Sequence, residues 1–120
     1  LIADVLTRYR FDVRRKGNNV WSRSKNFDDA KPTLLLDAHL DTVRPNGTWD
    51  SDPFTPIVKE GKLFGLGSND TGGSLVSMLA VFVELASESL PSNLIFLVCA
   101  GRGEYGKWRD SKRVSGIWSG

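Results

Sequence analysis

The chain is poor in the residues that most often carry chemistry, since its 120 residues include one histidine, one cysteine and one methionine. A single cysteine excludes an internal disulfide and favours a reducing compartment, so we predict a cytoplasmic protein. Cys99 lies in an apolar run, which predicts an inert buried thiol. No apolar run is long enough to cross a membrane, and the first ten residues are too charged for a signal peptide. We therefore expect no membrane partner.

The net charge of +2 is unevenly distributed. Residues from Arg102 onward carry five basic and two acidic side chains, whereas the preceding part is slightly acidic. A basic segment can indicate nucleic-acid binding, but this one has no hydrophobic period, and Trp108 and Trp118 share no recognisable face. We therefore interpret residues 101–120 as an anomalous, disordered tail and expect no nucleic-acid partner.

The first 100 residues have the pattern of one α/β domain in which helices pack on a mixed sheet. Helices are predicted where apolar residues recur at helical spacing, and buried strands where short runs are fully apolar. The predicted elements are helices at 1–9 and 73–88, strands at 11–13, from Val20 onward, at 33–37 and at 93–100, and a hairpin at 57–64. The strand–helix–strand order at 33–100 indicates a parallel crossover.

The histidine follows a run of leucines, in the segment Leu36-Asp37-Ala38-His39-Leu40-Asp41-Thr42. In a His-x-Asp pair at the end of a strand, both side chains point the same way, at the carboxyl edge where open α/β sheets bind ligands. The carboxylate can fix the tautomer of the histidine and raise its basicity as a metal ligand. The alternative, which a lone His-x-Asp pair favours, is a histidine with ordinary hydrogen bonds in a loop.

A glycine-rich segment, Gly65-Leu66-Gly67-Ser68-Asn69-Asp70, lies about thirty residues further on. Asp70 stands where a dinucleotide fingerprint needs its third glycine, and the Gly-Lys-Ser/Thr of a P-loop is absent. The segment is therefore a loop that presents one carboxylate ahead of a helix. Glycines let the backbone approach an ion closely, and a carboxylate can bridge two metal ions.

Together these segments resemble one family. The block His39-Leu40-Asp41-Thr42-Val43, then Trp49 with Asp52-Pro53-Phe54, then Gly65-x-Gly67-x-x-Asp70, is similar in order and spacing to the zinc-dependent aminoacylase, carboxypeptidase and acetylornithine deacetylase family of metallohydrolases. The resemblance covers roughly residues 1–100. Residues 16–21 and 69–74 look most like the acetylornithine deacetylase branch, although Leu66 and Gly72 stand where the family often has arginine and lysine.

The resemblance implies a zinc-exopeptidase-like catalytic domain that holds two divalent metal ions, zinc or cobalt. His39 would bind one metal, Asp70 would bridge both and precede a cis peptide bond to Thr71, and Asp41 would act in catalysis by orienting His39. The implied reaction is hydrolysis of the amide bond of a small N-acyl amino acid, as in arginine biosynthesis, by a full-length homodimer. We interpret Trp49 and Phe54 as packing residues that brace the His39 loop.

One part of the family's site is missing from the sequence. The family places a Glu-Glu pair, a general base followed by a metal ligand, after the strand predicted at 93–100, but this chain continues Gly101-Arg102-Gly103-Glu104. Glu104 stands alone, so we interpret it as a solvated loop residue. A metal held only by His39 and Asp70 would lack ligands, because zinc sites of this kind need at least three from the protein.

A one-nucleotide frameshift near Ala100 would explain the missing pair, and sequencing the gene tests this hypothesis. We therefore expect residues 1–100 to be the amino-terminal part of a metallohydrolase domain, truncated and inactive alone. The chain also lacks an initiator methionine, so we expect an upstream piece to be missing. The alternatives are a non-catalytic binding module, for which ordered packing of Trp108 and Trp118 would be the sign, and a non-functional gene remnant.

Overall fold

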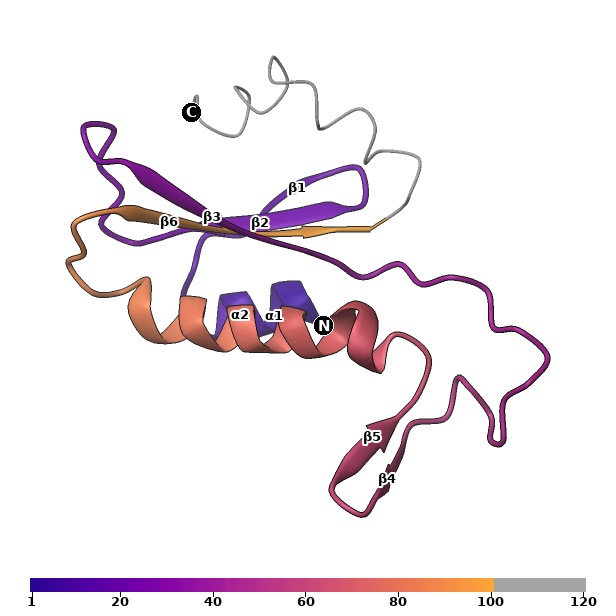
Figure 1. Ribbon diagram of the computed structural model, residues 1–120. Coiled ribbons are helices and arrows are strands. Elements are labelled where there is room, and N and C mark those ends of the chain that lie inside the picture. Colours follow the sequence, from indigo (N-terminus) through magenta and orange to yellow (C-terminus); the bar gives the residue numbers. More distant parts are fainter. Residues whose placement is uncertain (101–120) are drawn as a thin grey trace.

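A four-stranded mixed sheet with two helices on one face forms the body of residues 1–100, the part that this computed structural model describes (Figure 1). The predicted α/β class is therefore confirmed. The elements are α1 (Ile2–Arg8), β1 (Arg14–Lys16), β2 (Asn19–Arg23), β3 (Thr33–His39), β4 (Ile57–Lys59), β5 (Lys62–Phe64), the short helical segment η1 (Ser68–Gly72), α2 (Gly73–Leu85) and β6 (Asn93–Cys99). The predictions for Glu104, Trp108, Trp118 and the order of 101–120 lie outside the described residues.

The sheet has the strand order β1-β2-β6-β3. β6 pairs with β2 in antiparallel fashion and with β3 in parallel fashion, and α2 forms the crossover from β3 to β6. Every residue of β6 is buried, as its continuous apolar run predicts for a strand with neighbours on both sides. The parallel pairing brings the ends of β3 and β6 together, with His39 opposite Cys99.

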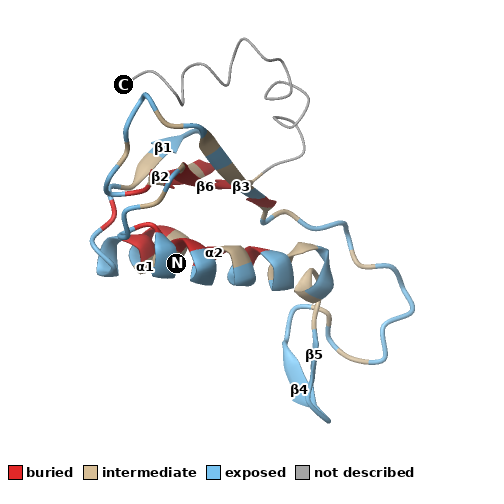
Figure 2. Ribbon diagram, turned by 60° about the vertical axis from the view of Figure 1, so that its left-hand side comes forward, coloured by how far each residue is buried: buried red, intermediate tan, exposed pale blue. Residues whose placement is uncertain are grey.

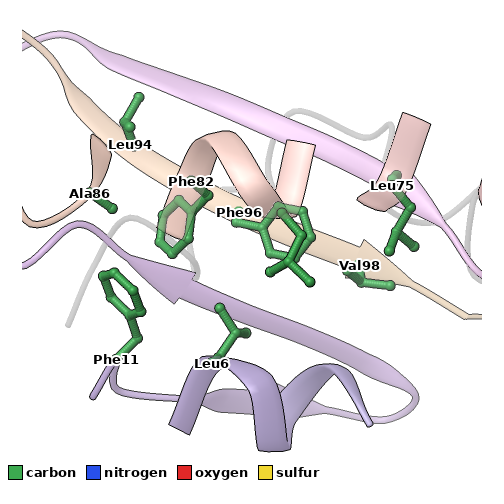
Figure 3. Packing of buried hydrophobic residues seen from close by; sticks show 10 residues of the cluster. Leu6, Phe11, Leu75, Phe82, Ala86, Leu94, Phe96 and Val98 are labelled. Carbon is green, nitrogen blue, oxygen red and sulfur yellow. The ribbon is translucent and has the colours of Figure 1, made fainter. Parts of the chain in front are cut away.

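The main core lies between the helices and one face of the sheet (Figure 3). Phe82 of α2 is fully buried, with its ring centroid 4.9 Å from that of Phe11 and 5.7 Å from that of Phe96. Leu6 of α1 contributes a further fully buried side chain. Burying a side chain of this size stabilises the fold by about 1.5–3 kcal/mol, so these residues hold both helices on the sheet.

The strand predicted at 11–13 is wrong, because pairing with β2 begins at Arg14. α1 ends in a tight turn in which Arg10 adopts a left-handed conformation (φ 62°) and the Phe11 amide donates to the Leu6 carbonyl (3.0 Å). This turn directs Phe11 into the core instead of into the sheet. The helix predicted to reach residue 88 ends at Leu85.

The prediction that 33–37 is a fully buried strand is also wrong. Within residues 1–100, β3 is an edge strand whose single neighbour is β6, and Leu34 is 54% exposed. β3 also runs two residues further than predicted, to His39. An apolar run thus identified the strand, but its place in the sheet decided how far it is buried.

Two further features lie away from the main core. The hairpin β4–β5 projects from the body and is exposed along both strands, with Glu60 and Gly61 in left-handed conformations at its turn (Figure 2). The opposite face of the sheet carries a smaller apolar cluster that includes Trp21, Ile95 and Leu97. None of the helices in residues 1–100 has the length and apolar character that crossing a membrane requires.

Candidate metal centre

His39 is the last residue of β3, at the carboxyl edge of the sheet. The Leu40 amide still donates to the Cys99 carbonyl (2.9 Å), so the backbone on both sides of His39 is held by β6. After Leu40 the chain leaves the sheet for the loop that leads to β4. The imidazole therefore projects from a rigid strand end, where open α/β sheets place their ligands.

Asp70 is presented by η1 and the glycines around it. Gly67 adopts a left-handed conformation (φ 78°), and its carbonyl accepts the Gly72 amide at 2.8 Å. Asp70 and Thr71 depart from helical geometry inside this turn, and the peptide bond between them is cis, in agreement with what the family resemblance implies. The bend exposes the Asp70 carboxylate toward the end of β3.

The two predicted metal ligands meet although 31 residues separate them in the sequence. His39 Nε2 lies 3.1 Å from Asp70 Oδ1. On the other side of the ring, Nδ1 lies 3.0 Å from the backbone carbonyl oxygen of Asp41 and 3.5 Å from its carboxylate oxygen Oδ1. Asp41 therefore contacts the ring as predicted, but its carbonyl oxygen is nearer than its carboxylate.

This arrangement favours a positive charge between His39 and Asp70. Nδ1 faces oxygen acceptors and so carries a hydrogen, which in the neutral ring leaves a lone pair on Nε2. That lone pair would face a carboxylate oxygen at 3.1 Å. Either a second proton on the ring or a metal cation relieves the repulsion, and neutral imidazole with carboxylate is a common ligand pair for divalent metals.

The pair fits part of a zinc site. Two ligand atoms bound at about 2.0–2.1 Å in tetrahedral geometry lie about 3.3 Å apart, close to the 3.1 Å between Nε2 and Oδ1. A complete site needs at least three protein ligands. Among residues 1–100 no group of three or more histidine, cysteine, aspartate or glutamate side chains is arranged to hold a metal. His39 and Asp70 therefore supply two ligands of an incomplete set.

An open hollow of about 270 Å³ lies over this pair, between the loop after β3 and η1. Trp49 lines the hollow together with His39 and Asp70 and is 38% exposed, so its predicted role as a packing residue that braces the His39 loop stays a prediction. Phe54 is 72% exposed, so the prediction that it braces this loop is wrong. The Asp52 side chain accepts from the Phe54 amide and turns the chain there, which leaves the Phe54 ring in solvent.

The contact that joins the two loops was not predicted from the sequence. A Cβ atom on Gly67 would lie 2.5 Å from Cγ2 of Thr42, so η1 approaches the segment after His39 as closely as glycine permits. Gly72 is equally restricted, because a Cβ there would lie 2.8 Å from the Gly67 carbonyl oxygen. The Gly-x-Gly pattern indicates that the backbone approaches another group closely. Nothing in the sequence indicates that this group is the Thr42 side chain.

A second acid lies two residues before His39 on β3. The Cys99 thiol donates to Asp37 Oδ1 at 3.6 Å, and Cys99 is buried as predicted. Burial raises the pKa of the Asp37 carboxyl, while the Cys99 hydrogen bond and the charge of His39 act against the rise. Asp37 points to the same side of β3 as His39, but its side-chain contact is with Cys99 and not with Asp70. We therefore assign Asp37 to the contact between β3 and β6 and not to the metal site.

Comparisons with known proteins identify a family and several relatives. A profile of peptidase family M20/M25/M40 matches residues 35–101. The chain is similar to the succinyl-diaminopimelate desuccinylase of Anaplasma marginale (strain Florida), with 36% identity over 105 residues that cover 85% of the chain and 26% of the relative. It is also similar to the N-formyl-4-amino-5-aminomethyl-2-methylpyrimidine deformylase of Bacillus subtilis (strain 168), with 33% identity over 111 residues, 87% of the chain and 26% of the relative.

Solved structures share the fold. Human carnosine dipeptidase 1 superposes with a TM-score of 0.61 at 24% identity, over 80% of this chain and 24% of that one. The dipeptidase Dug1p of Saccharomyces cerevisiae gives a TM-score of 0.59 at 24% identity, over 82% of this chain and 25% of that one. The chain thus spans about a quarter of the length of the relatives that it matches.

Proposed function

Because the chain belongs to peptidase family M20/M25/M40, we propose that residues 1–100 form the amino-terminal part of a dinuclear metal-dependent amide hydrolase. In this proposal His39 and Asp70 would hold the metal ions, with Asp70 as the ligand shared between them, and Asp41 would orient the His39 ring. The metals would be zinc or cobalt. The observation that carries the proposal is the approach of His39 Nε2 to Asp70 Oδ1, at 3.1 Å, which brings an imidazole nitrogen and a carboxylate oxygen together as a metal cation between them would require.

The residues of this chain would act by binding and positioning. The metal pair, when bound, would supply an activated water molecule and polarise the amide carbonyl. The Asp41 carbonyl, 3.0 Å from Nδ1, holds the imidazole with Nε2 toward Asp70. The hollow beside Trp49 would receive the substrate. The general base and the remaining ligands would come from outside residues 1–100, so the 120-residue chain by itself would be inactive.

We propose a small N-acyl amino acid as the substrate class. The names of two relatives describe removal of an acyl group, succinyl or formyl, and the first of them, the desuccinylase, has an N-acyl amino acid as its substrate. The acetylornithine deacetylase branch, and with it a role in arginine biosynthesis, is the narrower version of the proposal, supported by residues 16–21 and 69–74. A homodimer as the working form is part of the same proposal.

A chimeric enzyme tests the function directly. Residues 1–100 replace the corresponding segment of the Anaplasma marginale relative, and turnover of N-succinyl-diaminopimelate and N-acetylornithine is measured with added zinc or cobalt. We expect metal-dependent turnover that a chelator abolishes, and a preference between the two substrates that distinguishes desuccinylase from deacetylase. The 120-residue chain assayed in parallel should show negligible turnover of N-acetylornithine.

Variants of the chimera separate the proposed roles. His39→Ala and Asp70→Ala should each lower kcat/KM by at least about 100-fold. Asp41→Ala should have a smaller effect, of about 10-fold, because it removes the carboxylate at 3.5 Å from Nδ1 and keeps the backbone carbonyl at 3.0 Å. The control is Asp50→Asn, which removes an exposed carboxylate from the loop after β3 and should leave turnover unchanged. A folded chimera without metal-dependent turnover, or one that keeps it after His39→Ala, would contradict the proposal.

A further inference from the structure

A second cavity, of about 450 Å³, lies between segments 10–14 and 23–29. We call it the basic cavity, because its charged lining residues are Arg10, Arg14, Arg23, Lys25, Asp12 and Asp29. Its size is within the range of about 300–1,000 Å³ that is usual for small-molecule sites. No part of the proposed hydrolase function uses these residues.

The basic cavity lies at the other end of the sheet from His39. Arg23 is opposite Ile95, near the start of β6, whereas His39 is opposite Cys99 at its end. Four residues of strand separate these two positions, which is about 13 Å. A ligand in the basic cavity would therefore not compete with a substrate in the hollow over His39.

Positive charge is in excess in the basic cavity, with four cationic side chains against two carboxylates. Arg14 Nε donates to Asp12 Oδ2 at 3.2 Å, which uses one of the two acids. Burial and then the nearby charge of Arg14 lower the pKa of Arg23, while the carboxylates of Asp29 and Asp12 oppose this decrease. An anion bound between the cations would oppose it further.

Aromatic rings and backbone hydrogen bonds hold the cations in place. Lys25 Nζ lies 4.8 Å from the ring centroid of Phe11, and the Arg23 guanidinium carbon lies 4.7 Å from that of Phe27. Such cation–π contacts fix the direction of a long side chain. The Lys25 amide donates to the Ala86 carbonyl at 2.8 Å, so its backbone is tied to the end of α2. A ligand would meet cations that are already ordered, which lowers the entropic cost of binding.

Arg10 gives an independent indication that this site has a use. It adopts φ 62° directly after α1, a position where glycine is the most stable residue. A non-glycine residue there costs about 1–2 kcal/mol. The turn that directs Phe11 into the core thus also places a guanidinium group at the basic cavity, at a cost in stability that glycine would avoid.

We propose that the basic cavity binds a small molecule that carries a doubly charged oxyanion, either a phosphate group or a dicarboxylate. Guanidinium groups form paired hydrogen bonds with both kinds of anion. The excess of two positive charges matches a dianion. This inference goes beyond the proposed hydrolase function and does not depend on it.

The test is a titration of the ¹⁵N-labelled 120-residue chain, followed by amide NMR shifts. The probes are inorganic phosphate and succinate, with sodium chloride at matched ionic strength as the reference. We expect saturable shifts at the amides of Ser24 and Lys25 with at least one of the two dianions. Phosphate alone would assign a phosphate ligand, and succinate alone a dicarboxylate.

Two variants keep the test independent of folding. Arg10→Gly removes a charge and also the backbone strain, so it should bind about tenfold more weakly while melting at the same or a higher temperature. Lys25→Gln should weaken binding to a similar degree. The matched controls lie on the β4–β5 hairpin: Glu60→Gly changes another left-handed residue (φ 52°), and Lys62→Gln removes an exposed cation. Neither control should affect binding.

Three results would overturn the proposal. The first is the absence of saturable shifts with both dianions. The second is an equal response to sodium chloride, which would show screening of charge instead of binding. The third is unchanged affinity in both Arg10→Gly and Lys25→Gln.

Discussion

The distance between the two candidate metal ligands depends on a glycine that is not itself a candidate ligand. Gly67 contributes no side chain, yet its contact with Thr42 sets how closely η1 approaches the end of β3. Because interiors are packed at crystal-like density, a single added methyl group has to move something. At this position the loop that carries Asp70 is what would move.

We predict that Gly67→Ala destabilises the chain and separates Asp70 from His39. The alanine methyl group would lie 2.5 Å from Thr42 Cγ2, and φ is 78°. The conformation alone costs about 1–2 kcal/mol, and the clash adds to it. Urea unfolding measures the loss, and the matched control is Gly61→Ala, which has φ 72° and open space around it.

Removing the methyl group of Thr42 separates the cost of the left-handed conformation from the cost of the steric clash. Thr42→Ser deletes Cγ2, so Gly67→Ala in this background should lose little more than Gly61→Ala does. A double-mutant cycle gives the coupling between the two positions. If Gly67→Ala cost the same free energy of unfolding with and without the Thr42→Ser change, the contact would not restrict η1.

The Asp52 carboxylate holds the turn at 52–55, and we predict a pH dependence from it. Hydrogen bonds from the Thr55 hydroxyl (2.7 Å) and the Phe54 amide (2.9 Å) lower the pKa of Asp52 below 3.8. Since the folded pKa is lowered, the contribution of this carboxylate to the turn is present above pH 3.8 and is lost as the pH falls through the lowered value. Carboxyl NMR titration should show the Asp52 pKa rising in Thr55→Ala, with Thr55→Ser close to the unmodified chain.

At the scale of elements, α2 carries apolar residues on a buried face and also on an exposed face. Leu75, Leu79 and Phe82 are buried against the sheet, whereas Val76 and Val81 are exposed. The apolar stripe at helical spacing excludes Val81 but includes Val76, which lies next to Leu75 and is nevertheless 62% exposed. The depth of each residue depends on where the sheet and α1 lie.

We predict that two neighbouring residues of α2 differ sharply in their contribution to stability. Phe82→Ala should cost about 3–5 kcal/mol, because it removes a fully buried ring between Phe11 and Phe96 and leaves a cavity. Val81→Ala, at a position that is 48% exposed, should change stability by no more than about 0.5 kcal/mol. Urea unfolding followed by far-UV circular dichroism compares them, and similar costs would contradict the packing of α2 described above.

At the scale of the whole molecule, we predict a gradient of local stability from β6 to the hairpin. β6 is buried throughout and hydrogen-bonded to strands on both sides, whereas β4 and β5 are exposed along their length (Figure 2). A two-stranded hairpin is at best marginally stable, so its amides should exchange with solvent far faster than those of β6. Amide hydrogen exchange measures this, and hairpin protection equal to that of β6 would show that the hairpin is held by the body.

Local pattern explains which parts of the fold could be predicted. The continuous apolar run at 94–98 predicted β6, and the turn residues Glu60-Gly61 between two short segments predicted the hairpin. The prediction of a strand at 11–13 was wrong because the turn after α1 depends on the left-handed conformation of Arg10. Arginine has no preference for that conformation, so the sequence does not indicate the turn. The prediction that β3 is fully buried was wrong because its position at the edge depends on the whole sheet and not on the residues of the strand.

The candidate site divides in the same way. The sequence by itself determined the chemistry on offer, an imidazole at a strand end and a carboxylate in a glycine-rich loop, because side-chain type and spacing are local properties. Only the tertiary structure decided that Nε2 and Oδ1 lie 3.1 Å apart and that Thr42 packs against Gly67. Distances between residues far apart in the chain follow from how β3, η1 and α2 pack together, and that packing depends on all of their contacts at once.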